Sequence, residues 1–416
     1  MISEARLALA SLSLYRNLVQ DPVIFSLQEL LRVLDKTGPG QQDQLAPASA
    51  WGTFLYHLHA SGNSFRRHLL HLVLHDDNPF SRAAEMSTGN DINPALRAAA
   101  SQDLQRLHRL YELNFSRLLQ GAGLNISLLE GFPEQEGQSG YKVILDGSQD
   151  VEAGVDLLTS YYSRYSRGIC SLYRAFRWDS QEVLTGLACP DPIGMDELIG
   201  YQYQKDTLLT NTRHFLAGLP ANNVLLYGSR GTGKSSMVKA LLQEPGSEKL
   251  ALVEVSREGL ASLSKLVARL RGYSLRFILY IDDLSFEDYE TEYKGLKAIL
   301  EGSLEARPDN VLIYATSNRR HLVKEFFSDR SSLDEEIHAR DTMEEKLSLA
   351  DRFGLVITFP TPAKQLYLDM VESMVGKRGL VIERGELQRR ALEWERSHNG
   401  PSGRTARQFV DSLAGV

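Results

Sequence analysis

A glycine-rich segment in the second half of the chain has the pattern of a phosphate-binding loop. It reads Gly228-Ser-Arg-Gly-Thr-Gly-Lys-Ser235 and fits G-x-x-x-x-G-K-[ST] between a predicted strand and a predicted helix. Glycines permit the tight turn that points N–H groups at phosphate oxygens, and a helix start favours an anion. We therefore expect ATP here, with Lys234 on the β- and γ-phosphates and Ser235 as a Mg²⁺ ligand. The loop residues expected to contact the nucleotide are Gly228, Ser229, Arg230, Gly231, Thr232, Gly233, Lys234, Ser235 and Ser236.

Two adjacent carboxylates follow a later apolar run. The segment 277–281 predicts a buried strand, and Asp282 and Asp283 come directly after it. Ligands bind at the carboxyl ends of strands in open α/β sheets, and Mg²⁺ prefers carboxylates together with phosphate oxygens. We expect Asp282 to hold Mg²⁺, directly or through water, and Asp283 to orient the attacking water. The alternative, two solvated acids in a turn, is less favoured because of the phosphate loop upstream.

The elements that position these residues follow from the apolar pattern. Five short runs are apolar on both faces, which is typical of a parallel sheet covered on both sides: 223–227, 250–255, 277–281, 311–315 and 355–359. Helical segments separate the runs, and three helical stretches follow them. The sequence thus predicts an α/β core with a helical C-terminal region.

The first part of the chain differs from the core in composition and in its predicted secondary structure. It is Leu-rich and helical to about residue 123, with a short strand expected over 141–145 and a Tyr-rich helical stretch over 151–178. A linker with two prolines at 189–193 places a domain boundary near residue 190. The expected domains are a mainly helical N-terminal domain (1–190), the nucleotide-binding core (191–362) and a helical lid (363–416).

The two motifs resemble the Walker A and Walker B motifs of AAA+ ATPases. Further segments then fall where that family has functional residues. Residues 315–319, Ala-Thr-Ser-Asn-Arg, resemble sensor 1, which implies that Asn318 contacts the γ-phosphate or the water. Residues 349–354, Leu-Ala-Asp-Arg-Phe-Gly, resemble the arginine-finger box of replication-initiator-like members, which implies Arg352 as the finger. Arg340 and Arg330 are the alternatives for the finger. If Arg352 has only a structural role, we expect it to form a local ion pair with Asp351 or a nearby acid.

The resemblance also covers the lid and the segment before the core. Residues 403–408 resemble sensor 2, with Arg404 favoured over Arg407, and 196–200 resemble the stretch that packs against adenine, implying Ile199 and Gly200. More closely, the blocks 221–236, 282–286 and 314–322 resemble the bacterial AAA+ family DUF815. This resemblance extends over most of the chain. The resemblance implies an ATPase core with a parallel five-stranded sheet, and it does not indicate which protein client the ATPase would act on.

One residue departs from the general AAA+ pattern. The second Walker B acid is usually Glu, whereas this chain has Asp283, which is one methylene shorter. Slow hydrolysis, or a base supplied by Glu287, is therefore an alternative that the sequence leaves open. Replication-initiator-like proteins share the double Asp.

Composition excludes several other classes of protein. Of the residues, 43% are apolar and 24% charged, the net charge is −7, and there are two cysteines. This composition indicates a globular protein without a disulfide framework or a multi-cysteine zinc site. The longest apolar run is too short for a membrane span, so we expect a cytoplasmic protein without a membrane partner. The net negative charge disfavours constitutive, sequence-independent binding to nucleic acid.

Two clusters in the N-terminal part suggest other ligands. His68, His71 and His75 share one helix face, which could hold Zn²⁺. Arginines interleave with the Tyr-rich stretch, a pattern also found on single-strand nucleic-acid surfaces; they are Arg164, Arg167, Arg174 and Arg177. Core or solvated histidines and packing tyrosines are the commoner outcomes, so neither ligand is favoured.

The sequence as a whole predicts an AAA+ ATPase that hydrolyses Mg²⁺–ATP at subunit interfaces. The expected partners are further copies of the chain, in a hexamer-like ring or an ATP-dependent assembly, and an unidentified protein client to be remodelled. The alternative is a binding switch in which ATP sets the assembly state and hydrolysis is incidental. A small-molecule kinase is less favoured, because no pattern of a substrate pocket is present.

Overall fold

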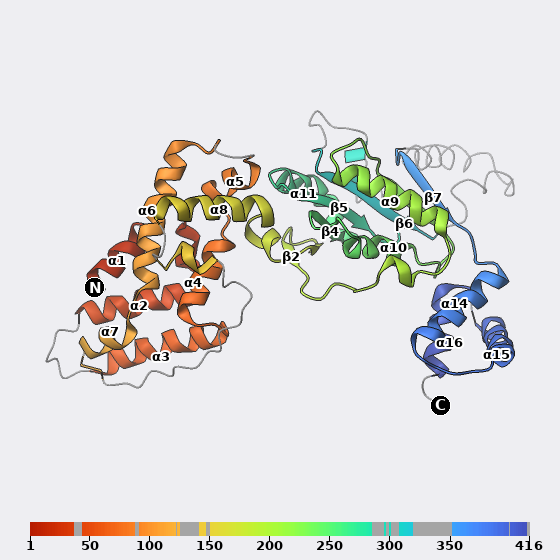
Figure 1. Ribbon diagram of the computed structural model, residues 1–416, viewed down its shortest axis with the longest axis horizontal. Helices are drawn as coiled ribbons and strands as arrows, with labels where there is room; N and C mark the ends of the chain where they lie inside the picture. The colour runs from red at the N-terminus through yellow and green to blue at the C-terminus, as the bar shows by residue number, and fades with distance from the viewer. Residues whose placement is uncertain are drawn as a thin grey trace, which may run out of the picture. The chain divides into compact units, whose positions relative to one another are not determined.

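The computed structural model describes residues 1–36, 44–87, 91–121, 123–124, 141–146, 150–284, 295–296, 299–300, 308–318, 352–398 and 400–413. The chain divides into two compact units, Met1–Leu172 and Tyr173–Val416. Figure 1 shows the helices of the first unit in red to yellow and the sheet of the second in green to blue.

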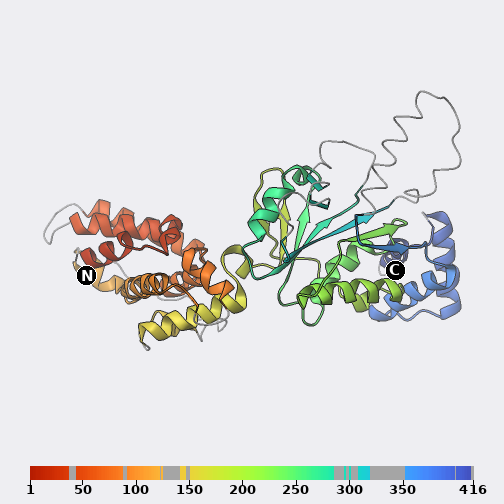
Figure 2. The ribbon, with the colours of Figure 1, turned by 90° about the horizontal axis from the view of Figure 1, so that it is seen from above.

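The first unit is built from helices around one apolar core. Its helices are α1 (Ile2–Ala10), α2 (Pro22–Lys36), α3 (Leu45–Ala60), α4 (Phe65–Leu74), α5 (Pro79–Met86), α6 (Pro94–Tyr111), α7 (Phe115–Gly121) and α8 (Val151–Tyr165), with the 3₁₀ turns η1 (Arg16–Gln20) and η3 (Gly168–Ser171). Leu, Phe and Tyr side chains from all of these α-helices fill the core, in which Tyr15, Phe54 and Tyr162 are fully buried. Figure 2 shows the same helices from above.

The prediction of a strand at 141–145 is wrong. Residues 141–144 form a 3₁₀ turn instead. Ile144 and Leu145 are buried in the helical core, and the Leu145 carbonyl oxygen lies 2.7 Å from Nδ1 of His108 on α6. The apolar run therefore packs on helices, and no strand lies beside it among the described residues of this unit.

The second unit is organised around a mostly parallel sheet. In its described residues the strand order is β2-β1-β4-β5-β6-β3-β7. The strands are β1 (Ala175–Trp178), β2 (Leu184–Gly186), β3 (Val224–Gly228), β4 (Leu250–Val255), β5 (Arg276–Ile281), β6 (Val311–Ser317) and β7 (Leu355–Phe359). The connecting helices are α9 (Gln202–Leu216), α10 (Lys234–Ala240) and α11 (Leu263–Leu270), with 3₁₀ turns η4 (Met195–Glu197), η5 (Leu241–Gln243) and η6 (Glu258–Ser262). The five predicted strands are confirmed, and β1 and β2 extend the sheet beyond them.

The sheet places the division between the units earlier than the linker near residue 190. Strand β1 pairs in parallel with β4, with Phe176 opposite Val253, and β2 pairs with β1 in antiparallel fashion. Residues 175–178 were expected to be helical, but α8 ends at Tyr165 and the chain then enters the sheet. A four-residue apolar run cannot be assigned to helix or strand from its periodicity alone.

Three C-terminal helices form a small layer with its own core. They are α14 (Lys364–Lys377), α15 (Arg384–Ser397) and α16 (Gly403–Leu413). Tyr367 and Val371 of α14 pack with Phe409 and Val410 of α16, and all four are buried. Ile199 and Tyr201, which precede α9, pack against the same core.

Candidate nucleotide-binding site

The glycine-rich segment forms a loop between β3 and α10. Gly228, Gly231 and Gly233 have φ angles of 143°, 74° and 90°. A side chain at Gly228 would collide with the carbonyl oxygen of Phe359 on the adjacent strand β7. Glycine therefore allows both the left-handed turns and the close packing of the loop on the sheet.

Lys234 turns back over this loop. Its Nζ atom donates to the carbonyl oxygens of Gly228 and Ser229, at 2.9 and 2.8 Å, and to Oδ1 of Asn318 at 2.9 Å. Burial lowers the pKa of Lys234 to about 8, against the opposing effect of Asp282 and Asp283. The ammonium group is thus held at the loop in a position where a polyphosphate would replace weak acceptors with a strong one.

Asp282 is held by two hydroxyl groups. Ser235 Oγ and Thr316 Oγ1 donate to its Oδ1 atom at 2.8 and 2.6 Å. Burial works to raise the pKa of Asp282, but hydrogen bonding, led by Thr316, lowers it below the usual value. The carboxylate is therefore ionised at neutral pH, and with the Ser235 hydroxyl it gives the oxygen set that Mg²⁺ prefers.

Asp283 lies at the ends of the two central strands β5 and β6. Its backbone N–H donates to Thr316 Oγ1 at 2.9 Å, and its Oδ1 atom accepts from Asn318 Nδ2 at 2.7 Å. Its φ angle is 52°, in the left-handed region that few residues other than glycine adopt. Such a conformation needs support from its surroundings, which Thr316 and Asn318 supply.

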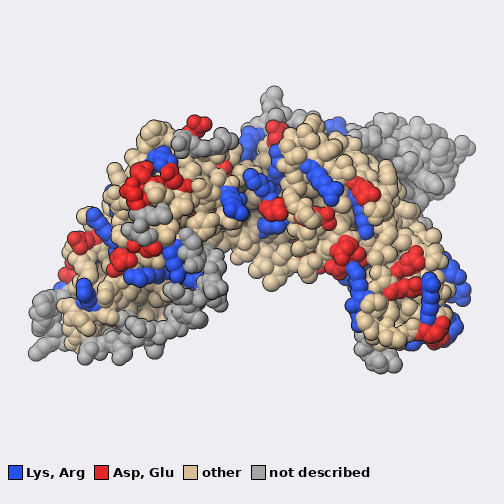
Figure 3. All heavy atoms as spheres, in the orientation of Figure 1, with Lys and Arg blue, Asp and Glu red and all other residues tan. Residues whose placement is uncertain are grey.

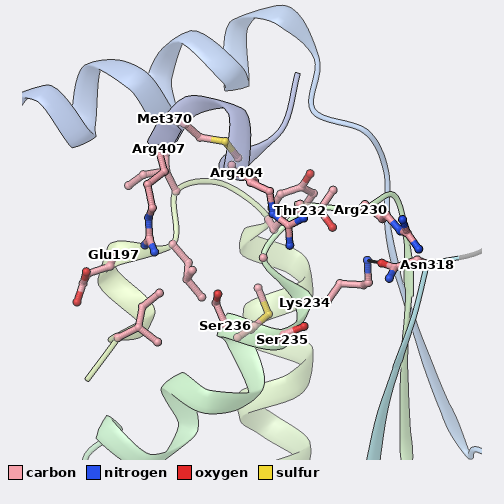
Figure 4. Close-up of a pocket in the computed structure, with 18 of the residues that line it drawn as sticks. Glu197, Arg230, Thr232, Lys234, Ser235, Ser236, Asn318, Met370, Arg404 and Arg407 are labelled. Atoms are coloured by element: carbon pink, nitrogen blue, oxygen red, sulfur yellow. Dashed lines mark hydrogen bonds between the residues drawn. The ribbon is translucent and has the colours of Figure 1, made fainter. Parts of the chain in front are cut away.

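A cavity of about 610 Å³ opens beside the loop and combines a polar end with an apolar end. The predicted residues that line it are Ile199, Arg230, Gly231, Thr232, Gly233, Lys234, Ser235, Ser236, Asp282, Asp283, Asn318 and Arg404. Figure 4 shows Lys234 and Asn318 together at one side and Arg407 and Glu197 at the other. A polar end beside an apolar end suits a ligand with phosphates and a planar base.

Other lining residues were missed by sequence analysis or weighed differently. Glu197 and Leu198, from the 196–200 segment expected to pack against adenine, line the cavity, as does Arg407, the less favoured sensor 2 residue. Ile193, Tyr201, Met370 and Met374 line it without having been predicted. They sit on an irregular segment and on the lid, where apolar side chains have no distinguishing spacing. Gly228, Ser229 and Gly200 do not line the cavity. Gly200, at φ 80°, instead leaves room for Leu366 of α14.

The lid reaches the phosphate loop through its last helix. The backbone N–H of Arg404, near the start of α16, donates to the Gly231 carbonyl oxygen at 3.3 Å. A Cβ atom on Gly231 would lie 2.9 Å from Ser402 Oγ and 3.2 Å from Arg404 Cβ. The close approach of α16 thus depends on a glycine at position 231.

Arg352 lies away from this cavity. It sits in the turn before β7, whose first residue, Leu355, pairs with Val224 at the start of β3. The phosphate loop follows the other end of β3, about 13 Å away for four steps along a strand. Arg352 is not among the residues that line the chain's own cavity. The alternatives Arg330 and Arg340, and the alternative base Glu287, lie outside the described residues.

The two alternative ligand clusters of the N-terminal part are not supported. His68 is bound to Asp21 at 2.9 Å and His75 to Ser171 at 2.7 Å, and the described residues contain no group of three or more potential metal ligands. Arg167 is buried between Glu85 and Asp77, and Arg174 donates to three backbone carbonyls. Figure 3 shows acidic and basic side chains interspersed on the visible face of this unit.

Comparison with known proteins identifies the family. A family model described as "Protein of unknown function (DUF815)" matches residues 171–416. The chain belongs to the DUF815 family. The match begins two residues before the second unit, so that β1 and β2 lie within the DUF815 region. No curated protein matches the sequence, and the described part of this DUF815 chain has no helix long and apolar enough to cross a membrane.

Part of the DUF815 chain is similar in fold to solved structures, one of which is an AAA domain. The Thermotoga maritima RuvB Holliday junction branch migration motor matches at 16% identity and a TM-score of 0.38, over 54% of this chain and 65% of that one. The FIGL-1 AAA domain in complex with ADP matches at 18% identity and a TM-score of 0.38, over 54% of this chain and 73% of that one. A chain of the Escherichia coli MS115-1 HORMA:CdnC:Trip13 complex matches at 12% identity and a TM-score of 0.32, over 52% of this chain and 89% of that one. The matched part spans slightly less than two thirds of the RuvB chain.

Proposed function

We propose that this DUF815 protein binds ATP with Mg²⁺ and hydrolyses it. The observation that carries the proposal is the convergence of Lys234, Asp282 and Asn318 beside the phosphate loop. Asn318 is hydrogen-bonded to both Lys234 and Asp283, and Asp282 is hydrogen-bonded to Ser235. Phosphoryl transfer needs positioning and charge stabilisation more than covalent chemistry, and these side chains supply both.

Each of these residues has a role that its contacts support. Lys234 would leave the Gly228 and Ser229 carbonyl groups for the β- and γ-phosphates, while the N–H groups of the loop cradle them. Asp282 and Ser235 would hold Mg²⁺, which neutralises charge on the phosphates when bound. Asp283 and Asn318 would orient the attacking water, since both side chains already meet at the strand ends.

We further propose that Arg352 acts on the nucleotide of a neighbouring copy. Its place at the far end of β7 is incompatible with a direct contact to the chain's own phosphate loop. A positively charged side chain that reaches a neighbour's γ-phosphate stabilises charge in the transition state. This favours a hexamer-like ring or another ATP-dependent assembly, which would remodel an unidentified protein client. The low cysteine content, two residues in 416, supports a cytoplasmic location.

A nucleotide-gated assembly switch is the second candidate. It is favoured by the hydrogen bond from Asn318 to Oδ1 of Asp283, because this bond occupies one of the two carboxylate oxygens and makes Asp283 a weaker base for the attacking water. In such a switch ATP binding would set the assembly state, and turnover would be slow.

Nucleotide titration tests the proposal. Wild-type protein should bind ATP, and Lys234→Ala should lose at least about tenfold in affinity, because a charge-assisted contact contributes about 1.5–3 kcal/mol. Lys265→Ala is the control, since it removes a lysine that pairs with Glu182 and does not line the cavity. Equal affinity of wild type and Lys234→Ala would contradict the assignment.

A further inference from the structure

Tyr280 is a buried polar side chain beside the proposed metal site. It lies near the end of β5, and Asp282 comes directly after this strand, two residues further on. Side chains at this spacing lie on one face of an extended chain. Tyr280 is only 2% exposed, and its hydroxyl oxygen has no hydrogen-bond partner among the described residues. A buried hydroxyl without a partner costs folding free energy, and phenylalanine would avoid that cost.

The surroundings of this hydroxyl point to Asp282. Burial and the adjacent Asp282 carboxylate raise the pKa of Tyr280 above its ordinary value, so the phenol stays protonated as a donor. The ring borders a second cavity of about 320 Å³, but the hydroxyl oxygen itself is inaccessible to solvent. A water molecule in that cavity therefore cannot satisfy it.

Asp282 has capacity for one more donor. The bonds from Ser235 and Thr316 both end on Oδ1, and Oδ2 has no donor among the described residues. Carboxylates that hold a metal ion are themselves fixed by hydrogen bonds, and loss of such a partner typically weakens metal binding by about 10–100-fold.

We propose that Tyr280 is a positioning residue of the Mg²⁺ site, which donates a hydrogen bond to Asp282 when the ion and nucleotide bind. This inference rests on the proposed function. It gives a role to a buried hydroxyl that has no other partner among the described residues and that neighbours the Asp282 carboxylate.

Tyr314 offers a matched control. It lies opposite Tyr280 on the neighbouring strand β6 and is fully buried. Its hydroxyl, however, is paired with Thr212 and Asn211 of α9, at 2.8 and 3.0 Å. Tyr314→Phe thus deletes a buried hydroxyl of the same kind that has structural partners and no contact with the metal site.

The test is a Mg²⁺ titration of the binding of a fluorescent, non-hydrolysable ATP analogue to the full chain. In Tyr280→Phe the half-saturating Mg²⁺ concentration should rise about 10–100-fold, while analogue affinity in EDTA stays that of wild type. Tyr314→Phe should keep the wild-type Mg²⁺ dependence. In metal-free thermal melts, Tyr280→Phe should be as stable as wild type or more so, and Tyr314→Phe less stable.

Two other outcomes are distinguishable. If wild type binds the analogue in a Mg²⁺-dependent way and Tyr280→Phe shows the same Mg²⁺ dependence, this inference is overturned and the proposed function stands. If wild type binds no nucleotide at all, the proposed function fails and the inference fails with it.

Discussion

Asn318 donates a hydrogen bond from its side-chain amide to the carboxylate of Asp283, over 2.7 Å, across the ends of two neighbouring strands. The other side of the same amide accepts a hydrogen bond from Lys234 at 2.9 Å. The group expected to bind phosphate and the group expected to orient water are thus joined through one residue. A nucleotide that draws Lys234 to its phosphates would alter the hydrogen bonding of Asn318 and, through it, of Asp283.

We first predict that Asn318→Ala lowers ATP turnover by about 10²-fold, the usual cost of losing one oriented donor, and changes ATP affinity little. Phosphate release and nucleotide titration give the two quantities. Asn310→Ala is the control, because Asn310, just before β6, donates to three backbone carbonyls in the segment that precedes β5 and lies outside the cavity. Unchanged turnover in Asn318→Ala would remove Asn318 from the mechanism.

Asp283→Asn should bind ATP normally and lose most of its turnover. A group that orients or activates water contributes about 10²–10⁴-fold in rate, whereas nucleotide binding depends on the loop and on Asp282. Glu287→Gln should stay within a few fold of wild type in the same phosphate-release assay. The opposite ranking of the two variants would transfer the role to Glu287.

The sequence was sufficient to predict the parts of this site that depend on local pattern. The phosphate loop, the paired aspartates and Asn318 each follow a buried strand, and parallel strands bring their carboxyl ends to one edge. The apolar end of the cavity was less predictable, because Met370 and Met374 come from the lid. Their position depends on tertiary packing that no local spacing encodes. Strand β1 was missed for a related reason, since four residues are too few to show a period.

Gly231→Ala should weaken nucleotide binding by displacing the lid. The added methyl group would press on Ser402 and Arg404, at 2.9 and 3.2 Å, and would also be strained by the left-handed backbone. Gly246→Ala separates the two effects, because Gly246 has a φ angle of 83° but no atom within 4 Å of the added Cβ. Both variants should lose about 1 kcal/mol of stability from backbone strain, as measured by denaturant unfolding. Nucleotide affinity should fall only in Gly231→Ala, and an equal fall in both would exclude the lid contact.

ATP affinity should decrease as the pH rises above 8. The pKa of Lys234 is lowered to about 8 in the free protein, and a bound triphosphate would raise it, so binding takes up a proton above that pH. The dissociation constant should then increase about tenfold between pH 7 and pH 9. Lys234→Arg, whose side chain stays charged over this range, should show a flat profile. A flat profile in wild type would show that the ammonium group is not titrating at the site.

Arg352 should act in trans. Arg352→Ala should bind ATP almost normally but hydrolyse it poorly, because an arginine finger can contribute about 10³–10⁵-fold in rate. Lys234→Ala should bind ATP at least about tenfold more weakly, yet it can still offer Arg352 to a neighbour. A mixture of the two should therefore exceed the summed activity of the separate samples, increasingly so at higher protein concentration. Merely additive activity from subunits shown to exchange would mean that Arg352 acts in cis or is structural.

Phosphate release from Mg²⁺–ATP by the wild-type protein, measured beside Lys234→Ala prepared identically, tests the central claim most directly. The site described here predicts steady release by wild type, which stops when EDTA removes Mg²⁺ and is absent from Lys234→Ala. Equal release by both proteins, or none by wild type at concentrations that allow self-assembly, would contradict the assignment of this DUF815 protein as an ATPase.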